Sequence, residues 1–584
     1  MPAGEASVAA RFDVDPELLD RYLETVRFQA GACLMRQGTP GDACYFIDAG
    51  EVRVEVERPD LDSDGVVGYL RAGMLCGEFS LLDDGPRSAS AYADTEVTAR
   101  RLSRTRLDDL CDHAPEAGIR LLRSLGRDAA VKARSYSRHL EEFIFSSDRD
   151  PGVDQMVAAA VAAQAELEGW PEARIDALLR AVAAALLERA DELAEATVSE
   201  TGIGNVADKV IKNRFACTEV LQALDGAPGT GPRDGIAPGV TEIAGPMGVI
   251  LGLVPVTNPV STLIYKTLIC LKSRNALIAS VHQSALGVGH RTAGYIQAVL
   301  RAQDAPADLL QCIRRTSRRR TAMFMHHPDV ALILATGGAA MVRAAYSSGT
   351  PAIGVGSGNA PVWVCADADP AAAARTVVTS KSFDNGLICG SESNLVVDTA
   401  VRDRFAAELE RAGATVLNPE ETGLLTAWAF DPETGRLLSR ALGHSAQAIA
   451  EGAGIKRDPP VRLLVVPLDH PEGAYAREKL APIVSLQTVD GEDESLELCA
   501  RLLAAQGAGH TAIVHTGDLE RAARFAARVP ASRILVNGPG AQGCIGFGNG
   551  LTPALTLGCG TYGGTSTTDN VTYTNLLNIK RVAR

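Results

Sequence analysis

The chain of 584 residues has no apolar run long enough to cross a membrane, since a spanning helix needs about 20 predominantly apolar residues. Its longest run, Gly248 to Val256, is interrupted at Pro255 and followed by Asn258 and Pro259. The amino terminus also lacks the basic start and apolar centre of a secretory signal. These absences predict a soluble protein of the cytoplasm.

Paired cysteines are missing as well. The twelve cysteines are scattered singly, without a C-x-x-C pair or a Cys/His cluster at zinc-ligand spacing, so we expect free thiols and no metal site. An excess of basic residues is also absent: the formal net charge is −14, which disfavours nucleic acid as a partner. One basic cluster, Arg314 to Arg320, is either a solvated turn or a contact for a phosphate-bearing ligand.

The residues that are present describe an ordinary globular protein, with 46% hydrophobic and 22% charged residues. The length predicts two to four domains. Residues 28–102 alternate short apolar segments with Gly, Pro and Asp, a pattern typical of an all-β unit. We expect one long helical segment from Arg104 to Phe145, a linker from Ser146 to Gly152 and a helical run from Val153 to Ile203.

Beyond Gly245, apolar strands alternate with helices, which predicts an α/β fold with a parallel sheet covered on both faces. A dinucleotide is expected at the carboxyl edge of that sheet. No G-x-G-x-x-G follows the first strand, and the glycine-rich Gly354 to Gly358 comes too late to replace it. The predicted strands are Gly248–Val256, Asn275–Val281, Val330–Gly338 and Pro351–Gly358, and the helices between them include Pro259–Lys272 and Leu286–Arg301.

Six long motifs occur in order between Val153 and Arg584: LVPVTNPVSTLIYK, MHHPDVALILATGG, AAYSSGTPAIGVGSGNAPV, SKSFDNGLICGSES, EKLAPIV and LTLGCGTYGG. Together they resemble the aldehyde dehydrogenase superfamily, and within it the CoA-acylating acetaldehyde dehydrogenase branch. The resemblance implies a Rossmann-like NAD-binding domain at 153–375, a catalytic cysteine domain at 376–545 and a return to the first domain at 546–584. It also implies oligomerisation segments near 231–246 and at the C-terminus, hence a homodimer or larger homo-oligomer.

The resemblance assigns two catalytic residues. Cys389 is the nucleophile, whose thiolate adds to an aldehyde and is left carrying a thioester; a buried structural thiol is the alternative. Asn258 matches the side-chain amide that stabilises the oxyanion together with the backbone N–H of the nucleophile. Its alternative role is to cap the helix that starts at Pro259.

Four further residues match cofactor positions. Glu478 corresponds to the glutamate that holds the nicotinamide ribose, and Gly337 and Gly338 correspond to the turn along which the cofactor runs. His282 stands where hydrolytic relatives carry a lysine near the adenosine ribose. We therefore expect NAD as the cofactor, with NADP still open.

The family pattern lacks one acidic residue in this chain, and its absence favours CoA as the second substrate. Hydrolytic relatives carry a glutamate in an E-L-G-G-K segment that activates water, whereas the matching Gly354 to Pro361 contains no acid. General-base help is commonly worth about 10²–10⁴-fold, so water should attack the thioester slowly. CoA, a better nucleophile, is the expected acyl acceptor for a short-chain aldehyde.

The N-terminal 1–145 segment resembles a cyclic-nucleotide-binding domain in GDACYFIDAGEVRV and in GEFSLLDDGPRSA. The resemblance makes Arg87 the phosphate partner, Glu78 the ribose-hydroxyl partner, Ser88 an added phosphate donor and Gly77 part of the same turn. The expected effector is a cyclic nucleotide, cyclic AMP ahead of cyclic GMP, that regulates the fused enzyme. A β-roll that has lost its ligand is the alternative.

Two rival functions stay open at this point. One is a hydrolytic, CoA-independent semialdehyde dehydrogenase that takes its base from elsewhere, for instance Glu392. The other is a catalytically inactive, nucleotide-responsive scaffold, which the joint presence of Cys389, Asn258 and Glu478 disfavours.

Overall fold

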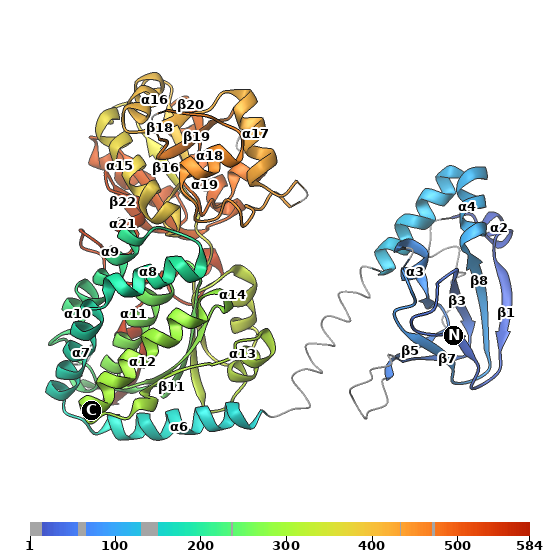
Figure 1. Ribbon diagram of the computed structural model, residues 1–584, viewed down its shortest axis with the longest axis horizontal. Helices are drawn as coiled ribbons and strands as arrows, with labels where there is room; N and C mark the ends of the chain where they lie inside the picture. The colour runs from blue at the N-terminus through green and yellow to red at the C-terminus, as the bar shows by residue number, and fades with distance from the viewer. Residues whose placement is uncertain are drawn as a thin grey trace. The chain divides into compact units, whose positions relative to one another are not determined.

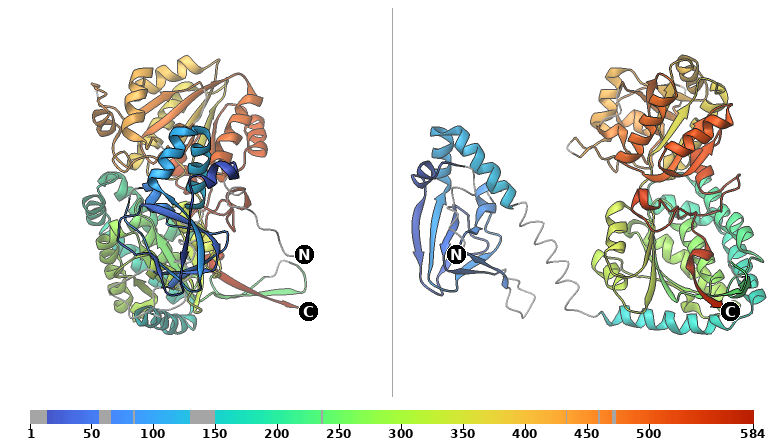
Figure 2. Two further views of the ribbon diagram at one scale, coloured as in Figure 1. Left: turned by 90° about the vertical axis from the view of Figure 1, so that its right-hand side faces the viewer. Right: turned by 180° about the vertical axis from the view of Figure 1, so that it is seen from behind.

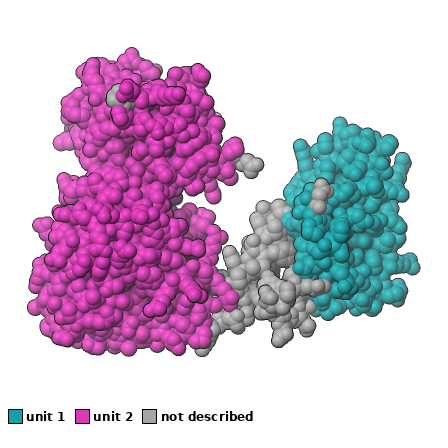
Figure 3. Space-filling view, viewed as in Figure 1, with its two compact units in different colours: residues 1–148 teal, residues 149–584 magenta. Residues whose placement is uncertain are grey.

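The chain forms two compact units, residues 1–148 and residues 149–584, seen as ribbons in Figure 1 and Figure 2 and as teal and magenta surfaces in Figure 3. The computed structural model describes residues 14–55, 66–83, 85–129, 150–234, 237–432, 434–458, 460–469 and 473–584. No helix within these ranges combines the length and the apolar character needed to span a membrane.

Unit 1 is built from two antiparallel four-stranded sheets, in the orders β1-β8-β3-β6 and β2-β7-β4-β5. Buried and less buried residues alternate along β4 and through most of β8, as expected for sheets that cover a core on one face. The predicted all-β roll is confirmed. The elements are β1 (Glu24–Phe28), β2 (Cys33–Met35), β3 (Ala43–Ala49), β4 (Glu51–Glu55), β5 (Val66–Arg71), β6 (Leu75–Cys76), β7 (Ser90–Ala93), β8 (Val97–Ser103), α2 (Pro16–Asp20), α3 (Glu78–Asp83) and α4 (Arg104–His113).

The prediction of one helix from Arg104 to Phe145 is wrong in its first part, because the helix is interrupted there. Helix α4 ends at His113, Ala114 has a non-helical φ of −141°, and helical geometry resumes over 115–129. Pro115 explains the break, because the residue before a proline is driven out of the α region. Residues 130–149, which hold the rest of that prediction and most of the predicted linker, lie outside the described residues.

The first half of unit 2 is a five-stranded parallel sheet with the order β13-β12-β11-β14-β15. Every residue of β11, β12 and the helix between them is buried, because helices cover both faces of the sheet. The strands are β11 (Val249–Val254), β12 (Ala276–Val281), β13 (Leu310–Cys312), β14 (Val330–Ala335) and β15 (Ala352–Gly354). The helices are α6 (Pro151–Glu168), α7 (Glu172–Leu187), α8 (Ala190–Thr201), α9 (Val206–Cys217), α10 (Glu219–Leu224), α11 (Pro259–Lys272), α12 (Leu286–Ala302), α13 (Arg318–Met325) and α14 (Ala339–Tyr346).

The second half is a seven-stranded parallel sheet with the order β18-β19-β20-β17-β16-β21-β22. The chain passes into it between β15 and β16, ahead of the boundary expected at residue 375, because β16 pairs with β17. Its strands are β16 (Ala360–Val364), β17 (Glu392–Asp398), β18 (Ala414–Val416), β19 (Leu463–Pro467), β20 (Ile483–Val489), β21 (Gly509–His515) and β22 (Ala531–Val536). Its helices are α15 (Pro370–Ser382), η3 (Phe383–Gly386), α16 (Arg402–Arg411), α17 (Pro419–Ala429), α18 (Ala446–Gly452), α19 (Glu492–Ala505), α20 (Leu519–Arg528) and α21 (Gly540–Cys544).

A third, antiparallel sheet joins the C-terminus to the first half of unit 2. Strand β23 (Leu577–Ala583) pairs with β10 (Val240–Pro246), which pairs in turn with β9 (Gly231–Asp234). In the left view of Figure 2 this ribbon extends away from the body of unit 2. Ile243 and Val582 are more than a third exposed on it.

Candidate active site

Cys389 lies in a short turn between η3 and β17 of the second sheet. Asp384 and Asn385 both have positive φ, 44° and 54°, which non-glycine residues adopt only where the surroundings hold them. A Cβ on Gly358 would lie 1.6 Å from the carbonyl oxygen of Cys389. A glycine at this position therefore lets the 354–361 segment pack directly onto the backbone of the cysteine.

The thiol of Cys389 contacts a histidine on β21. His510 Nε2 lies 3.1 Å from Cys389 Sγ, and its Nδ1 lies 2.9 Å from the Thr511 hydroxyl oxygen. Burial, reinforced by Arg533, lowers the pKa of His510 to about 3, so the ring is neutral at physiological pH. If Nδ1 is assigned the proton that it donates to Thr511, Nε2 is an acceptor for the thiol proton.

The same environment disfavours the thiolate in the resting protein. Burial, followed by the neighbouring Cys544, Glu478 and Cys559, raises the pKa of Cys389 well above its ordinary value, while Arg533 lowers it. Arg533 is 3% exposed and donates to the carbonyl of Gly558 at 2.5 Å. The guanidinium is thus a fixed positive charge near the sulfur.

These shifts predict how the reactivity of Cys389 depends on pH. Below the raised pKa of the thiol, the thiolate fraction and the rate of alkylation by iodoacetamide should grow about tenfold per pH unit. Mass spectrometry of the peptide that contains Cys389 measures this rate between pH 7 and pH 9. A rate that levels off near neutral pH would contradict the assignment of a raised pKa.

A buried ionic network supports the turn from the side of α9. Lys209 Nζ lies 2.9 Å from Asp384 Oδ2, and Lys212 Nζ donates to the same oxygen. The other carboxylate oxygen of Asp384 accepts the N–H of Asn205 at 2.9 Å. Burial, and then the charge of Lys212, lowers the pKa of Lys209 to about 8. One carboxylate therefore compensates two buried ammonium groups five residues before Cys389.

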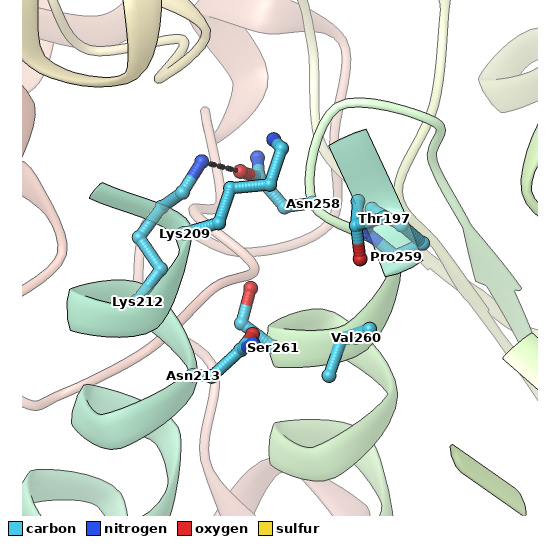
Figure 4. A pocket seen from close by; sticks show the side chains of 8 residues that line it. All are labelled: Thr197, Lys209, Lys212, Asn213, Asn258, Pro259, Val260 and Ser261. Carbon is cyan, nitrogen blue, oxygen red and sulfur yellow. Dashed lines mark hydrogen bonds between the residues drawn. The ribbon is translucent and has the colours of Figure 1, made fainter. Parts of the chain in front are cut away.

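The network also holds Asn258. Lys212 Nζ donates to Asn258 Oδ1, shown by the dashed line in Figure 4, and Asn258 Nδ2 donates to Thr257 Oγ1 at 3.2 Å. Asn258 occupies the N-cap position of α11 without a side-chain capping bond, so the capping role considered from the sequence is absent. Lys212 and Asn258 line a small pocket together with Thr197, Lys209, Asn213, Pro259, Val260 and Ser261.

Two carboxylates lie around the cysteine turn. Glu478 Oε1 accepts the backbone N–H of Gly358 at 2.9 Å, and burial raises the pKa of Glu478 to about 7. Glu392 is fully buried, and its Oε1 accepts the N–H of Gly540 at 2.7 Å. Glu392, the base considered for a hydrolytic enzyme, is thus engaged in holding the start of α21.

The remaining cofactor candidates line the carboxyl edge of the first sheet. His282 directly follows β12, and its backbone N–H donates to the carbonyl of Val254 on β11 at 3.0 Å. Burial lowers the pKa of His282. Gly337 and Gly338 lie between β14 and α14, and nothing lies within 4 Å of a Cβ placed on Gly338. This edge therefore leaves space for a ligand to approach the backbone.

The nucleotide candidates of unit 1 lie around a glycine turn. Arg87 is 4% exposed, its Nη1 donates to the Gly77 carbonyl at 2.9 Å, and its Nη2 lies 3.7 Å from Asp42 Oδ1. Gly77 has a φ of 85°, and a Cβ there would meet Arg87 Nη1 at 2.6 Å. Glu78 is buried at the start of α3, and Ser88 is exposed. The guanidinium is therefore held by the turn itself.

Sequence reasoning missed His510, Arg533 and the lysines of α9. The one available signal was a histidine near the start of a strand with an apolar centre, GHTAIVH. Lys209 and Lys212 stand in an ordinary helical pattern, and only the fold brings them to Asp384, more than 170 positions away.

Fold and site together define an α/β protein with two parallel sheets and a hydrogen-bonded cysteine at a turn, preceded in the chain by a β-roll. The aldehyde dehydrogenase family matches residues 143–548, and the cyclic nucleotide-binding domain matches residues 25–114. The chain belongs to the aldehyde dehydrogenase family.

Three relatives illustrate the similarity. Aldehyde-alcohol dehydrogenase 2 of Entamoeba histolytica is 39% identical over 448 residues, which cover 74% of this chain and 51% of that protein. An acetylating aldehyde dehydrogenase from Geobacillus thermoglucosidasius is 40% identical, with a TM-score of 0.72 over 74% of this chain and 96% of its own. A Rhodopseudomonas palustris propionaldehyde dehydrogenase, solved with bound CoA and an acylated cysteine, is 26% identical, with a TM-score of 0.68 over 74% of this chain and 97% of its own. The chain spans about half the length of the first of these, a curated relative.

Proposed function

We propose that this chain is a CoA-acylating aldehyde dehydrogenase that interconverts a short-chain aldehyde and its acyl-CoA with NAD. The observation that carries the proposal is the Cys389 thiol, 3.1 Å from a neutral His510, in a turn whose backbone packs against the 354–361 segment, which contains no acid. The acetylating relative and the CoA-bound propionaldehyde dehydrogenase support the same chemistry.

The residues present fit a dinucleotide along the carboxyl edge of the first sheet. A Cβ on Gly337 would meet only the side chain of Met341, at 3.8 Å, and one on Gly338 would meet nothing within 4 Å. His282 and Glu478 are the proposed contacts at the two ribose groups. When bound, the nicotinamide supplies a hydride acceptor and CoA supplies a second thiol.

The residues of the chain then prepare and stabilise the sulfur chemistry. His510 Nε2 accepts the hydrogen bond of the resting thiol but, with a pKa of about 3, does not keep its proton. The proton leaves to solvent as the thiol ionises, and Cys389 Sγ then forms a bond to the aldehyde carbon. Lys212 holds Asn258 Oδ1 and Thr257 Oγ1 accepts one N–H of its amide, which leaves the second N–H of Asn258 as the proposed donor to the developing oxyanion. Such a donor is typically worth a few kcal/mol in the transition state. Loss of hydride from the carbon leaves Cys389 acylated, and attack by the CoA thiol restores its sulfur.

Hydrolysis is the second candidate, because Glu478 is near enough to Cys389 to raise the pKa of its thiol. A carboxyl group with a pKa of about 7 has the basicity that a general base needs. Its Oε1, however, already accepts the N–H of Gly358. We therefore place CoA ahead of water as the acyl acceptor.

The requirement for CoA tests this function. With a short-chain aldehyde and NAD, steady NADH formation should fall at least about 100-fold when CoA is omitted, because Glu478 Oε1 is already engaged by Gly358 and the 354–361 segment offers no base to activate water. Chromatography should identify acyl-CoA as the product. Free acid formed at the same rate with and without CoA would support the hydrolytic enzyme, and no NADH from any aldehyde would support the inactive scaffold.

We also propose that unit 1 binds a cyclic nucleotide, with cyclic AMP ahead of cyclic GMP, and that binding alters dehydrogenase activity. The observation that supports this is the buried guanidinium of Arg87, whose partners among the described residues are one carbonyl and a carboxylate 3.7 Å away. A phosphate is a far stronger partner for a buried guanidinium than a carbonyl oxygen.

Replacement of Arg87 by glutamine should weaken cyclic AMP binding about 10- to 100-fold, since a hydrogen bond to a charged group contributes about 1.5–3 kcal/mol. Calorimetric titration of the full chain with cyclic AMP and cyclic GMP measures the affinities. The matched control is the replacement of Arg71 by glutamine. Arg71 is exposed on β5 and pairs with Glu51. Absence of binding by the unaltered protein would overturn the proposal.

We further propose a homo-oligomer in which the β9-β10-β23 sheet contacts another copy. An exposed edge strand invites pairing, and Ile243 and Val582 present apolar surface there. Light scattering should give a mass of at least two chains, and a single-chain mass would exclude this.

A further inference from the structure

Three arginines gather where β13 ends. Arg314 and Arg315 follow the strand, and Arg318 is the first residue of α13; all three are exposed. In the described part of the chain their side chains have no hydrogen bond or ion pair, whereas Arg320 lies 3.3 Å from Asp150. We call Arg314, Arg315 and Arg318 the arginine trio.

The fold places the trio beside the end of β12. Ala279 of β12 is in register with Cys312 of β13, and the N–H of Ile313 bonds the Ala279 carbonyl at 3.0 Å. Helix α13 is fixed to the same strand, because the Thr321 and Ser280 hydroxyl oxygens lie 3.0 Å apart in a buried contact. The trio therefore lies at the carboxyl edge of the sheet on which the dinucleotide is proposed to bind.

The end of β12 lacks the acid that an NAD-specific edge carries. Nucleotide-binding folds place a carboxylate here to bind the ribose hydroxyls, or an arginine that accommodates a phosphate on the ribose. His282 is followed by Gln283, Ser284 and Ala285, and burial lowers the pKa of His282, so its ring adds no charge.

One carboxylate at this edge, that of Glu200, is already engaged by backbone groups. Both carboxylate oxygens of Glu200 accept N–H groups at the start of α12, from Gly287 at 2.7 Å and Val288 at 2.6 Å.

We propose that the arginine trio binds the ribose monophosphate of an adenosine cofactor, either the 2′-phosphate of NADP or the 3′-phosphate of CoA. The chain is acidic overall, so a cluster of unpaired arginines at a binding edge is a local exception. Arginine forms bidentate bonds to phosphate. The proposal rests on the proposed function for its choice of cofactors.

Calorimetry on the full chain tests the trio without turnover. Adenosine 2′,5′-bisphosphate and adenosine 3′,5′-bisphosphate mimic the two sources, and 5′-AMP lacks the extra phosphate. At least one bisphosphate should bind about 10- to 100-fold tighter than 5′-AMP. The R314Q/R315Q double variant should lose most of this difference, and R318Q part of it. The matched control is R301Q, which removes an exposed arginine from the last turn of α12.

Each outcome decides the matter. Tighter binding of the 2′-phosphate alone assigns the site to NADP, of the 3′-phosphate alone to CoA, and of both to a shared site. The proposal is overturned if neither bisphosphate exceeds 5′-AMP, or if R301Q loses as much as R314Q/R315Q. Because binding is measured directly, a protein that binds a bisphosphate through the trio yet forms no NADH would fail only the proposed function.

Discussion

Replacement of Cys389 by alanine is expected to lower aldehyde-dependent NADH formation by about 10⁴-fold or more, because no other group can carry the acyl intermediate. Folding should be preserved, since the change removes only one sulfur atom from a side chain that keeps some exposure. The rate of NADH formation is measured with a short-chain aldehyde, NAD and CoA. Binding of NAD by the variant shows that the carboxyl edge of the first sheet is intact.

The control for this variant is Cys33→Ala in unit 1, whose exposed thiol donates to the Met35 carbonyl at 3.2 Å. It should keep the rate of the unaltered protein. Near-normal turnover by Cys389→Ala would show that the nucleophile had been assigned to the wrong residue.

Replacement of Asp384 by alanine is expected to lower the free energy of unfolding of unit 2 by about 3–5 kcal/mol, the usual cost of leaving a buried charge without its partner. Lys209 and Lys212 would both lose the carboxylate that they share. The three tryptophans, Trp170, Trp363 and Trp428, all belong to unit 2, so urea unfolding followed by their fluorescence reports on this unit.

The loss should also depend on pH. The pKa of Lys209 is lowered from 10.5 to about 8, so between these values the unfolded state binds more protons and stability rises with pH. Without Asp384 the lysine pKa falls further below 8, so the defect should shrink as the pH rises from 7 to about 8 and then stay constant, because above that value both proteins gain stability equally. Asp403→Ala, which breaks an exposed pair with Arg402, should change stability by less than about 0.5 kcal/mol. An Asp384→Ala defect no larger than that would refute the role of the network.

The elements with the strongest local pattern could be predicted well from the sequence. Helix α11 begins at Pro259 and ends at Lys272 as expected, because a proline at the first helical position and a continuous apolar run leave little choice. Strands β11 and β12 followed from uninterrupted apolar runs. The break at Ala114 was not predicted, although a proline at position 115 disfavours helical geometry at the residue before it.

The site was only partly predictable, because its chemistry depends on contacts between distant segments. The loop of Cys389 is visible as a glycine-flanked thiol, but His510 is 121 positions away and looks like any strand residue. The positions of Glu478 beside Gly358 and of Lys212 beside Asn258 likewise follow from how the sheets are assembled. The local sequence around each residue cannot predict these contacts, because they join segments that are far apart in the chain.

The fate of the acyl group on Cys389 tests the central claim most directly. The protein is mixed with excess aldehyde and NAD without CoA, and the peptide that contains Cys389 is followed by mass spectrometry together with NADH. The account predicts one NADH per site, a persistent acyl mass on Cys389 and release of that mass as acyl-CoA when CoA is added. Continued NADH formation with accumulating free acid, and no acyl group on Cys389, would contradict it.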